Sequence, residues 1–70
     1  MSSRVLPEWT GDDIRFLRMH VGLTQTAFGA MLGARQATIS EWETEVHRPR
    51  RMMRLMLTQL AKQAHFSIRS

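Results

Sequence analysis

Apolar residues recur at helical spacing in four separate stretches of this 70-residue chain. In the first stretch the apolar positions lie three and four residues apart: Ile14, Leu17 and Val21. Thr10 and Asp13 have the spacing of a capping box, in which each side chain accepts a hydrogen bond from the other residue's backbone N–H. Gly22 is of the type at which helices commonly end. The pattern predicts a first helix between Thr10 and Gly22.

Trp9 stands immediately before this helix. Its spacing from Ile14 is that of a hydrophobic staple, which packs a residue before the cap against the first turn. Contact with a partner molecule is the alternative, and the spacing leaves both open.

A second helix is predicted from Gln25 to Leu32, with Thr24 as its N-cap. Its apolar stripe consists of Ala27, Phe28, Met31 and Leu32. Gly33 ends the helix, because glycine readily adopts the left-handed conformation that a helix C-terminus prefers.

The third stretch, RQATISEWE, has only Ile39 and Trp42 to turn inward. The outward side of the same short helix carries polar side chains: Arg35, Gln36, Ser40 and Glu41. Such side chains can fork toward the edges of adenine and guanine, which favours insertion into a nucleic-acid groove. A solvated face is the alternative, and periodicity does not separate the two.

The fourth stretch, RRMMRLMLTQLAKQA, contains no glycine or proline, so it predicts a single helix of about fifteen residues with Pro49 in its first turn. Its apolar stripe consists of Met53, Met56, Leu57, Leu60 and Ala64. Met52 and Leu55 widen the apolar surface beyond what three short helices can cover, so we expect part of it to contact a second copy of the chain. Filling of the chain's own core by half of these residues is the alternative.

Charge and size add two constraints. The chain has ten Lys and Arg residues and six Asp and Glu residues, which gives a formal net charge of +4. Nine of the ten cations are arginine. Guanidinium groups bind phosphates and guanine edges bidentately, which favours a nucleic-acid partner, with surface ion pairs as the alternative. A chain this small buries only about 60% of its unfolded surface. Because it also has no cysteine, we expect oligomerisation to stabilise it.

Groups suited to catalysis are scarce. The histidines His20, His47 and His65 are scattered, Asp12 and Asp13 lie at a helix start, and no Gly-rich phosphate loop occurs. We therefore expect no enzymatic activity, no metal and no cofactor. The chain has no apolar stretch of signal-peptide or membrane-spanning type, so we expect a cytoplasmic protein without a membrane partner.

From Arg18 to Glu43, the sequence RMHVGLTQTAFGAMLGARQATISEWE resembles the helix-turn-helix of the lambda-repressor-like family, which includes Cro and Xre proteins. The positions that carry the resemblance are Gln25, Gly29, Gly33, Ile39 and Trp42. A weaker likeness extends from Asp12 to about Pro49. With the predicted helices, the resemblance implies an all-α fold, a compact bundle of four or five helices. We expect the DNA-binding domain to span 10–64, after an N-terminal arm over 1–9 and before a C-terminal tail over 65–70.

The resemblance also implies roles for individual residues in binding double-stranded DNA. The implied base-reading residues are Arg35, Gln36, Ala37, Ser40 and Glu41. The implied phosphate-binding residues are Thr24, Gln25, Thr38, Arg48, Arg50 and Arg51. Adenine is the best partner for Gln36, guanine suits Arg35, and Ala37 suits a thymine methyl group. For the run HRPRR a solvated charge cluster is the alternative.

The sequence departs from the family pattern in three places. Gly29 stands where the family usually has alanine, which suggests a looser second helix. Arg35 lies near the family's Ser or Thr N-cap and cannot cap, so the third helix either begins poorly capped or is completed by DNA phosphates. Residues 44–46 replace the usual Asn-Gly, which predicts a less tight loop. The resemblance further implies a partly buried ion pair between Arg18 and Glu43.

These features predict a transcriptional regulator: a dimeric repressor of its own or a neighbouring operon that binds a palindromic operator, of the phage, antitoxin or accessory-operon type. A protein partner such as a toxin fits the same interpretation. The alternative class is a protein-interaction adaptor whose basic face binds an acidic partner. If the last helix does not form the dimer, the alternative interface is the arm, with Val5, Leu6 and Trp9.

Overall fold

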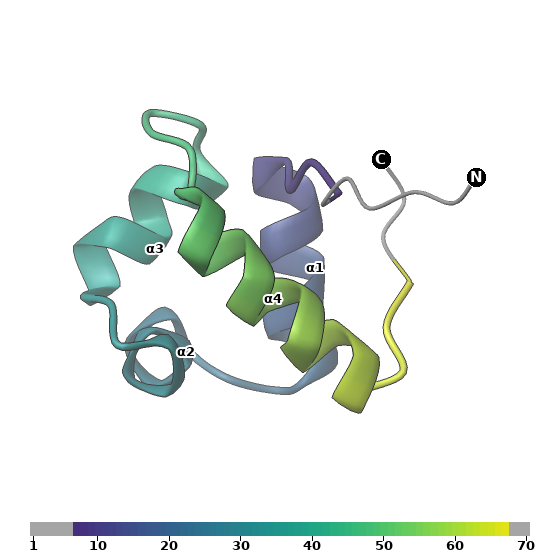
Figure 1. Ribbon diagram of the computed structural model, residues 1–70. Helices are drawn as coiled ribbons and strands as arrows, with labels where there is room; N and C mark the ends of the chain where they lie inside the picture. Colours follow the sequence, from purple (N-terminus) through teal and green to yellow (C-terminus); the bar gives the residue numbers. More distant parts are fainter. Residues whose placement is uncertain (1–6, 68–70) are drawn as a thin grey trace.

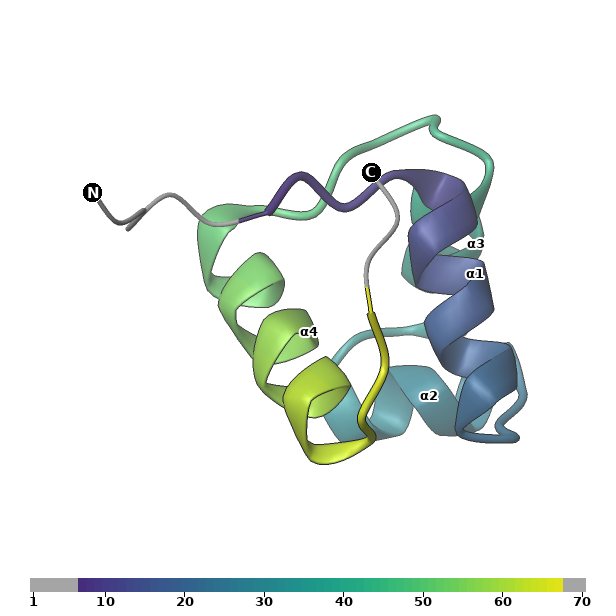
Figure 2. The same cartoon turned by 90° about the vertical axis from the view of Figure 1, so that its right-hand side faces the viewer.

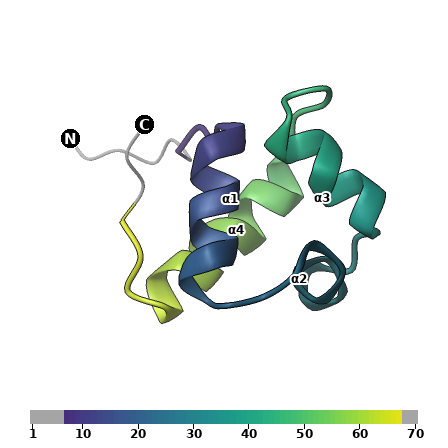
Figure 3. The same cartoon turned by 180° about the vertical axis from the view of Figure 1, so that it is seen from behind.

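The computed structural model describes residues 7–67, and this part of the chain contains four helices and no strand (Figure 1). The helices are α1 (Gly11–His20), α2 (Gln25–Leu32), α3 (Gln36–Glu43) and α4 (Arg51–Gln63). Figures 1 and 3 show α2 and α3 together on one side of the molecule and α1 on the other, with α4 in front of α1 in Figure 1 and behind it in Figure 3. The expected all-α architecture is confirmed, with four helices.

Both predicted threonine N-caps are present. The Thr10 hydroxyl accepts a hydrogen bond from the Asp13 N–H at 3.1 Å, and the Asp13 carboxylate accepts one from the Thr10 N–H at 3.3 Å. The Thr24 hydroxyl accepts a hydrogen bond from the N–H of Ala27 at 3.1 Å. At the other end of α2, Gly33 adopts the left-handed conformation, with φ of 73°. Local sequence signals therefore set the limits of α1 and α2.

One hydrophobic core lies between the helices. Its buried members are Trp9, Ile14, Leu17, Phe28, Leu32, Ile39, Trp42, Leu57 and Ala61. The indole N–H of Trp9 donates to the Thr58 hydroxyl on α4 at 3.1 Å, which ties the residue before α1 to the last helix. Because Trp9 is buried within the chain, an interface through the arm cannot include it. Val5 and Leu6 lie outside the described residues.

Two apolar residues differ in burial from what periodicity predicted. Met31 belongs to the predicted inward stripe of α2, yet 54% of its surface is exposed. Leu57 belongs to the predicted dimer interface, yet its side chain is completely buried within the chain. The apolar stripe of each helix is wider than its contact with neighbouring helices, so the packing angle decides which edge is covered.

The last helix is slightly shorter than predicted. It begins after Arg50 as N-cap and ends before Ala64, so Pro49 precedes the cap and does not occupy the first turn. Pro49 is buried, and packs where the chain enters α4.

The first residues of the predicted tail pack against the domain (Figure 2). His65 adopts the left-handed conformation with φ of 56°, and the Phe66 N–H donates to the Ala61 carbonyl at 2.8 Å. The half-buried Phe66 ring packs against the core, and its centroid lies 5.4 Å from that of His20 on α1. The packed part of the chain therefore extends beyond residue 64.

The helices α2 and α3 approach each other closely at Gly29. A Cβ atom there would lie 2.5 Å from the carbonyl oxygen of Ala34 and 3.3 Å from the side chain of Ile39. The Ala34 N–H also donates to the Gly29 carbonyl at 2.8 Å. Gly29 is therefore not the sign of a loose helix that the sequence suggested, because the close contact leaves no room for a side chain.

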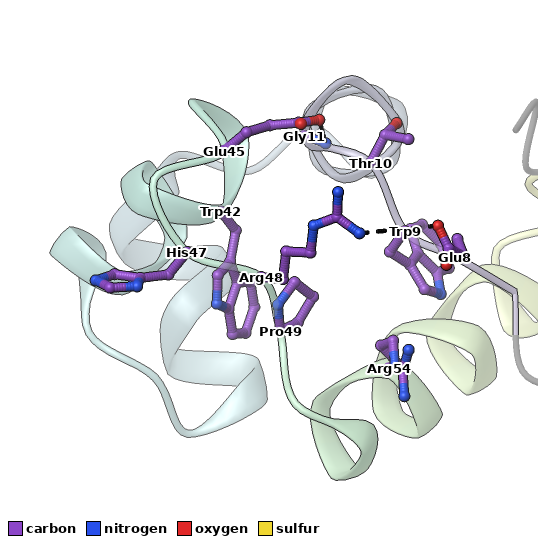
Figure 4. A pocket seen from close by; sticks show the side chains of 10 residues that line it. All are labelled: Glu8, Trp9, Thr10, Gly11, Trp42, Glu45, His47, Arg48, Pro49 and Arg54. Carbon is purple, nitrogen blue, oxygen red and sulfur yellow. Dashed lines mark hydrogen bonds and ion pairs between the residues drawn. The ribbon is translucent and has the colours of Figure 1, made fainter.

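A second close approach joins the start of α1 to the end of α3, and no sequence signal predicted it. A Cβ atom on Gly11 would overlap the carbonyl oxygen of Glu43. Glu45 reaches across the same junction, and its carboxylate accepts a hydrogen bond from the Gly11 N–H at 2.7 Å (Figure 4). The contact places a negative charge at the positive end of α1, which stabilises that helix.

The turn after α3 is tight, contrary to the expectation of a looser loop. Glu45 adopts the left-handed conformation, with φ of 63°. Its N–H donates to the Trp42 carbonyl at 3.2 Å, and the Val46 N–H donates to the Glu41 carbonyl at 2.9 Å, which is the pattern of a Schellman turn. The hydrogen bond from Gly11 to Glu45 helps a residue other than glycine or asparagine to hold this conformation.

Candidate nucleic-acid interface

The helix α3 buries Ile39 and Trp42, as predicted. The five predicted base-reading residues all have accessible surface on α3 or at its N-cap, exposed for the first three and half-buried for the last two: Arg35, Gln36, Ala37, Ser40 and Glu41. A short helix with one buried side and a row of polar groups opposite has the dimensions and chemistry to enter a major groove.

The start of α2 flanks α3 on one side and is linked to it by amide side chains. Gln25 donates from Nε2 to the Glu43 carboxylate at 3.0 Å, and its Oε1 accepts from Nε2 of Gln36 at 2.6 Å. Gln25 therefore keeps one free N–H for a phosphate. The Thr24 hydroxyl, which accepts from the helix backbone, keeps its own hydrogen to donate.

The predicted ion pair lies beneath this surface. Arg18 Nε donates to Glu43 Oε2 at 2.7 Å, and a second guanidinium nitrogen donates to Oε1 at 3.2 Å. A third donates to the Leu23 carbonyl at 3.0 Å. Only 5% of the Glu43 side chain is exposed. The hydrogen bond to Glu43 raises the pKa of Arg18, so the guanidinium stays charged at all ordinary pH values.

On the other side of α3, a groove of about 650 Å³ separates this helix from the start of α4. Its lining includes three arginines and a threonine that can donate to a phosphate: Arg35, Thr38, Arg48 and Arg50. Arg50 and Arg51 are exposed, and Thr38 is half-buried. The α3 surface is therefore bordered by donors on both sides, with α2 on one side and this groove on the other.

Both helices that border this groove begin without a side-chain cap. Arg35 at α3 and Arg50 at α4 are the N-cap residues, and neither makes a side-chain cap hydrogen bond. Neither helix has an acidic residue in its first turn, whereas Arg51 opens α4. Cations at the positive end of a helix dipole are unfavourable by about 0.3 to 1 kcal/mol each, and an anion bound there would reverse that balance.

Arg48 lines this groove, but its guanidinium lies toward the residues before α1 (Figure 4). Its guanidinium lies 3.9 Å from the Glu8 carboxylate, over a small cavity between the residues before α1 and the start of α4 (Figure 4). Both side chains are about three-quarters exposed, so the pair is weak and opens easily. Arg48 can thus turn to a phosphate at little energetic cost.

Four of the five predicted dimer residues remain candidates, with unequal exposure. Met56 is exposed, while Met53, Leu60 and Ala64 are half-buried; Leu57 is excluded because it is buried. An apolar groove of about 360 Å³ lies between α2 and α4, and we call it the α2–α4 groove. Its lining residues are Met31, Leu32, Leu55, Met56, Gln59, Leu60 and Gln63. None of them carries a charge.

No group of three or more His, Cys, Asp or Glu residues within 7–67 is arranged to hold a metal ion. In the same part of the chain, no helix has the length and apolar character needed to cross a membrane.

Comparison with known proteins agrees with the arrangement of α2 and α3. A helix-turn-helix family model of the Cro/C1 type matches residues 14–53, more than half of the chain. No curated protein and no solved structure matches the sequence. The matched segment contains α2, the turn at Gly33, α3 and the basic run before α4. The chain therefore belongs to the lambda-repressor-like helix-turn-helix family, a family of DNA-binding domains.

Proposed function

We propose that this protein is a sequence-specific regulator of transcription that represses its own or a neighbouring operon as a dimer on a palindromic site. The observation that carries the proposal is the exposed polar side of α3, bordered by donors from α2 and by a basic groove at two uncapped helix starts. Such an arrangement suits a helix placed between two phosphate backbones.

Base reading is assigned to the exposed side of α3. Gln36 offers an amide to adenine, Arg35 a guanidinium to guanine, and Ala37 a methyl group to thymine. Ser40 and Glu41 lie on the same helix and add a hydroxyl and a carboxylate, the latter suited to the cytosine amino group and repelled by phosphate.

Phosphate binding is assigned to the two borders of α3. The donors on the α2 side are Thr24 and Gln25, and those on the α4 side are Thr38, Arg48, Arg50 and Arg51. Because each neutralised phosphate releases counterions, binding through these residues predicts a steep dependence of affinity on salt concentration.

The experiment that tests the function is selection from a pool of randomised DNA duplexes, followed by binding measurements on the selected sequence at several salt concentrations. A regulator selects a defined sequence with inverted half-sites and binds random duplexes weakly, with an affinity that falls as salt rises. Failure to select any sequence, with little binding to random duplexes at low salt, contradicts the proposal and favours a protein-interaction adaptor.

A further inference from the structure

The turn after α3 is held by a contact with a distant part of the chain. Glu45 adopts the left-handed conformation, with φ of 63°, and its carboxylate accepts a hydrogen bond from the Gly11 N–H at 2.7 Å. Gly11 is the first residue of α1, so its N–H has no acceptor within its own helix. Figure 4 shows the side chain of Glu45 extended toward Gly11. The carboxylate thus supplies the acceptor that the start of α1 lacks.

Glutamate needs such a contact to hold this conformation. A residue with a Cβ atom is strained at positive φ, whereas glycine is not. The strain persists only where the surrounding structure compensates for it. A hydrogen bond from a backbone N–H to a charged carboxylate is among the stronger ones, and the positive end of α1 adds to it. Without this bond we expect residue 45 to leave the left-handed region, which redirects the chain that follows.

The chain that follows carries the basic run. Arg48, Arg50 and Arg51 come shortly after Glu45, and the first two line the groove beside α3. Of residues 44–50, only Pro49 is buried, so this exposed segment has few contacts with the core to hold it in place. The direction in which the chain leaves α3 therefore decides where these arginines lie relative to that helix.

We propose that Glu45 is a positioning residue for phosphate binding: its bond to Gly11 holds the turn after α3 so that the basic run faces the DNA backbone. The inference rests on the proposed function, because it specifies how the arginines on the α4 side reach their phosphates. It gives a role to an acidic side chain beside a basic run. It also links the start of α1 to DNA binding.

Charge and position predict opposite effects when this carboxylate is removed. Glu45 lines the small cavity beside Arg48, where a negative charge disfavours the approach of a phosphate. Loss of the charge alone should therefore raise the affinity for every duplex. Loss of the turn should lower it, because the arginines would no longer face the backbone. A decrease in affinity can then be assigned to position.

Three variants of Glu45 separate the two effects. Glu45→Gln and Glu45→Ala remove the same charge, but only glutamine keeps an oxygen that can accept a hydrogen bond from Gly11. Glu45→Gly also lacks the acceptor, yet glycine adopts positive φ without strain. Glu8→Gln is the matched control, because it removes the carboxylate that pairs with Arg48 and leaves the turn intact. Each variant is titrated with random duplexes and with the selected sequence at several salt concentrations.

We expect Glu45→Gln, Glu45→Gly and Glu8→Gln to bind random duplexes at least as tightly as the wild type. Glu45→Ala should bind them about fivefold or more weakly, and its salt slope should be flatter by about one to two units. Base preference on the selected sequence should not change in any variant, because Gln36 lies at the opposite end of α3. Since Glu45 is exposed, its replacement leaves the core intact, and circular dichroism checks the folding of each variant.

A second measurement needs no variant. Hydrogen exchange of the Gly11 amide is followed by NMR in the wild type, both free and bound to the selected duplex. We expect slow exchange in both states, because the bond to Glu45 persists when DNA binds. Rapid exchange in the complex would overturn the inference, even if Glu45→Ala does not fold.

The outcomes separate this inference from the proposed function. If the wild type binds no duplex at low salt, the function itself is wrong. If it binds DNA, but Glu45→Ala binds as tightly and with the same salt slope as Glu45→Gln, the role of Glu45 is wrong and the function stands. The same conclusion follows if Glu45→Gly binds as weakly as Glu45→Ala.

Discussion

At the scale of single residues, Gln36 has the clearest assignment, because it is exposed at the start of α3 and keeps both an acceptor and a donor free. We expect Gln36→Ala to lower the affinity for the selected sequence by about 1 to 3 kcal/mol, with almost no change on random duplexes. Fluorescence anisotropy on both duplexes measures the difference. Equal losses on the two would remove Gln36 from base reading.

Gly29 provides a residue-scale test of the packing between α2 and α3. Alanine favours a helix by about 1 kcal/mol over glycine, yet its Cβ would lie 2.5 Å from a backbone oxygen. We expect the clash to dominate, so that Gly29→Ala lowers the free energy of unfolding by about 1 to 3 kcal/mol. Urea denaturation measures this loss. Thr26→Ala, at an exposed position of the same helix, is the control and should not be destabilised.

At the scale of the elements, the ion pair between Arg18 and Glu43 joins α1 to the end of α3. Because Glu43 is nearly buried, Glu43→Ala leaves a guanidinium without its partner, and we expect a loss of about 3 kcal/mol in the free energy of unfolding. Thermal and urea denaturation test this. Asp12→Ala, which removes the exposed pair with Arg15, should cost less than about 1 kcal/mol. Similar losses for both variants would contradict the structural role of the buried pair.

The start of α4 predicts effects of opposite sign on stability and on binding. Arg50 and Arg51 lie at the uncapped, positive end of this helix, so replacing either by alanine should leave stability unchanged or raise it by up to about 1 kcal/mol. The same variants should bind all duplexes more weakly, and each should flatten the salt dependence by about one unit. Binding at several salt concentrations checks this, with Arg15→Ala on α1 as control. An unchanged slope of affinity against salt concentration would show that these arginines do not contact phosphates.

At the scale of the whole molecule, the α2–α4 groove is the surface best suited to a second copy. Its seven lining residues are uncharged, so two chains of net charge +4 can meet there without placing like charges in contact. Two-fold pairing would present two α3 helices to one face of DNA, about 34 Å apart, and would account for an inverted repeat.

Met56→Glu tests this pairing, because Met56 lines the α2–α4 groove and is exposed, unlike Leu60, which packs against the core. We expect the variant to stay folded, to sediment as a monomer, and to lose affinity for a two-half-site duplex but not for a single half-site. Met19→Glu, at a 61% exposed position on α1, is the control. A variant that keeps the wild-type mass and affinity would place the interface elsewhere.

The sequence by itself determined the features that depend on residues within about one helical turn. The caps of α1 and α2 are hydrogen bonds to backbone N–H groups three positions away, made by Thr10, Asp13 and Thr24. The left-handed conformation that ends α2 depends only on the residue type of Gly33. These residue types alone therefore predicted where α1 and α2 begin and where α2 ends. The pattern between Arg18 and Glu43 was specific enough to identify the family and, through it, the buried ion pair.

Only the tertiary structure decided the features that depend on a neighbouring helix. Whether Gly29 loosens α2 or allows α3 to pack closely against it depends on the distance to Ala34, which no local pattern encodes. The exposure of Met31 and the burial of Leu57 depend on how α2 and α4 pack against their neighbours. The conformation of Glu45 depends on Gly11, 34 positions earlier in the chain. Periodicity shows that a helix has an apolar side, but the packing of that side settles what it covers and which polar groups meet.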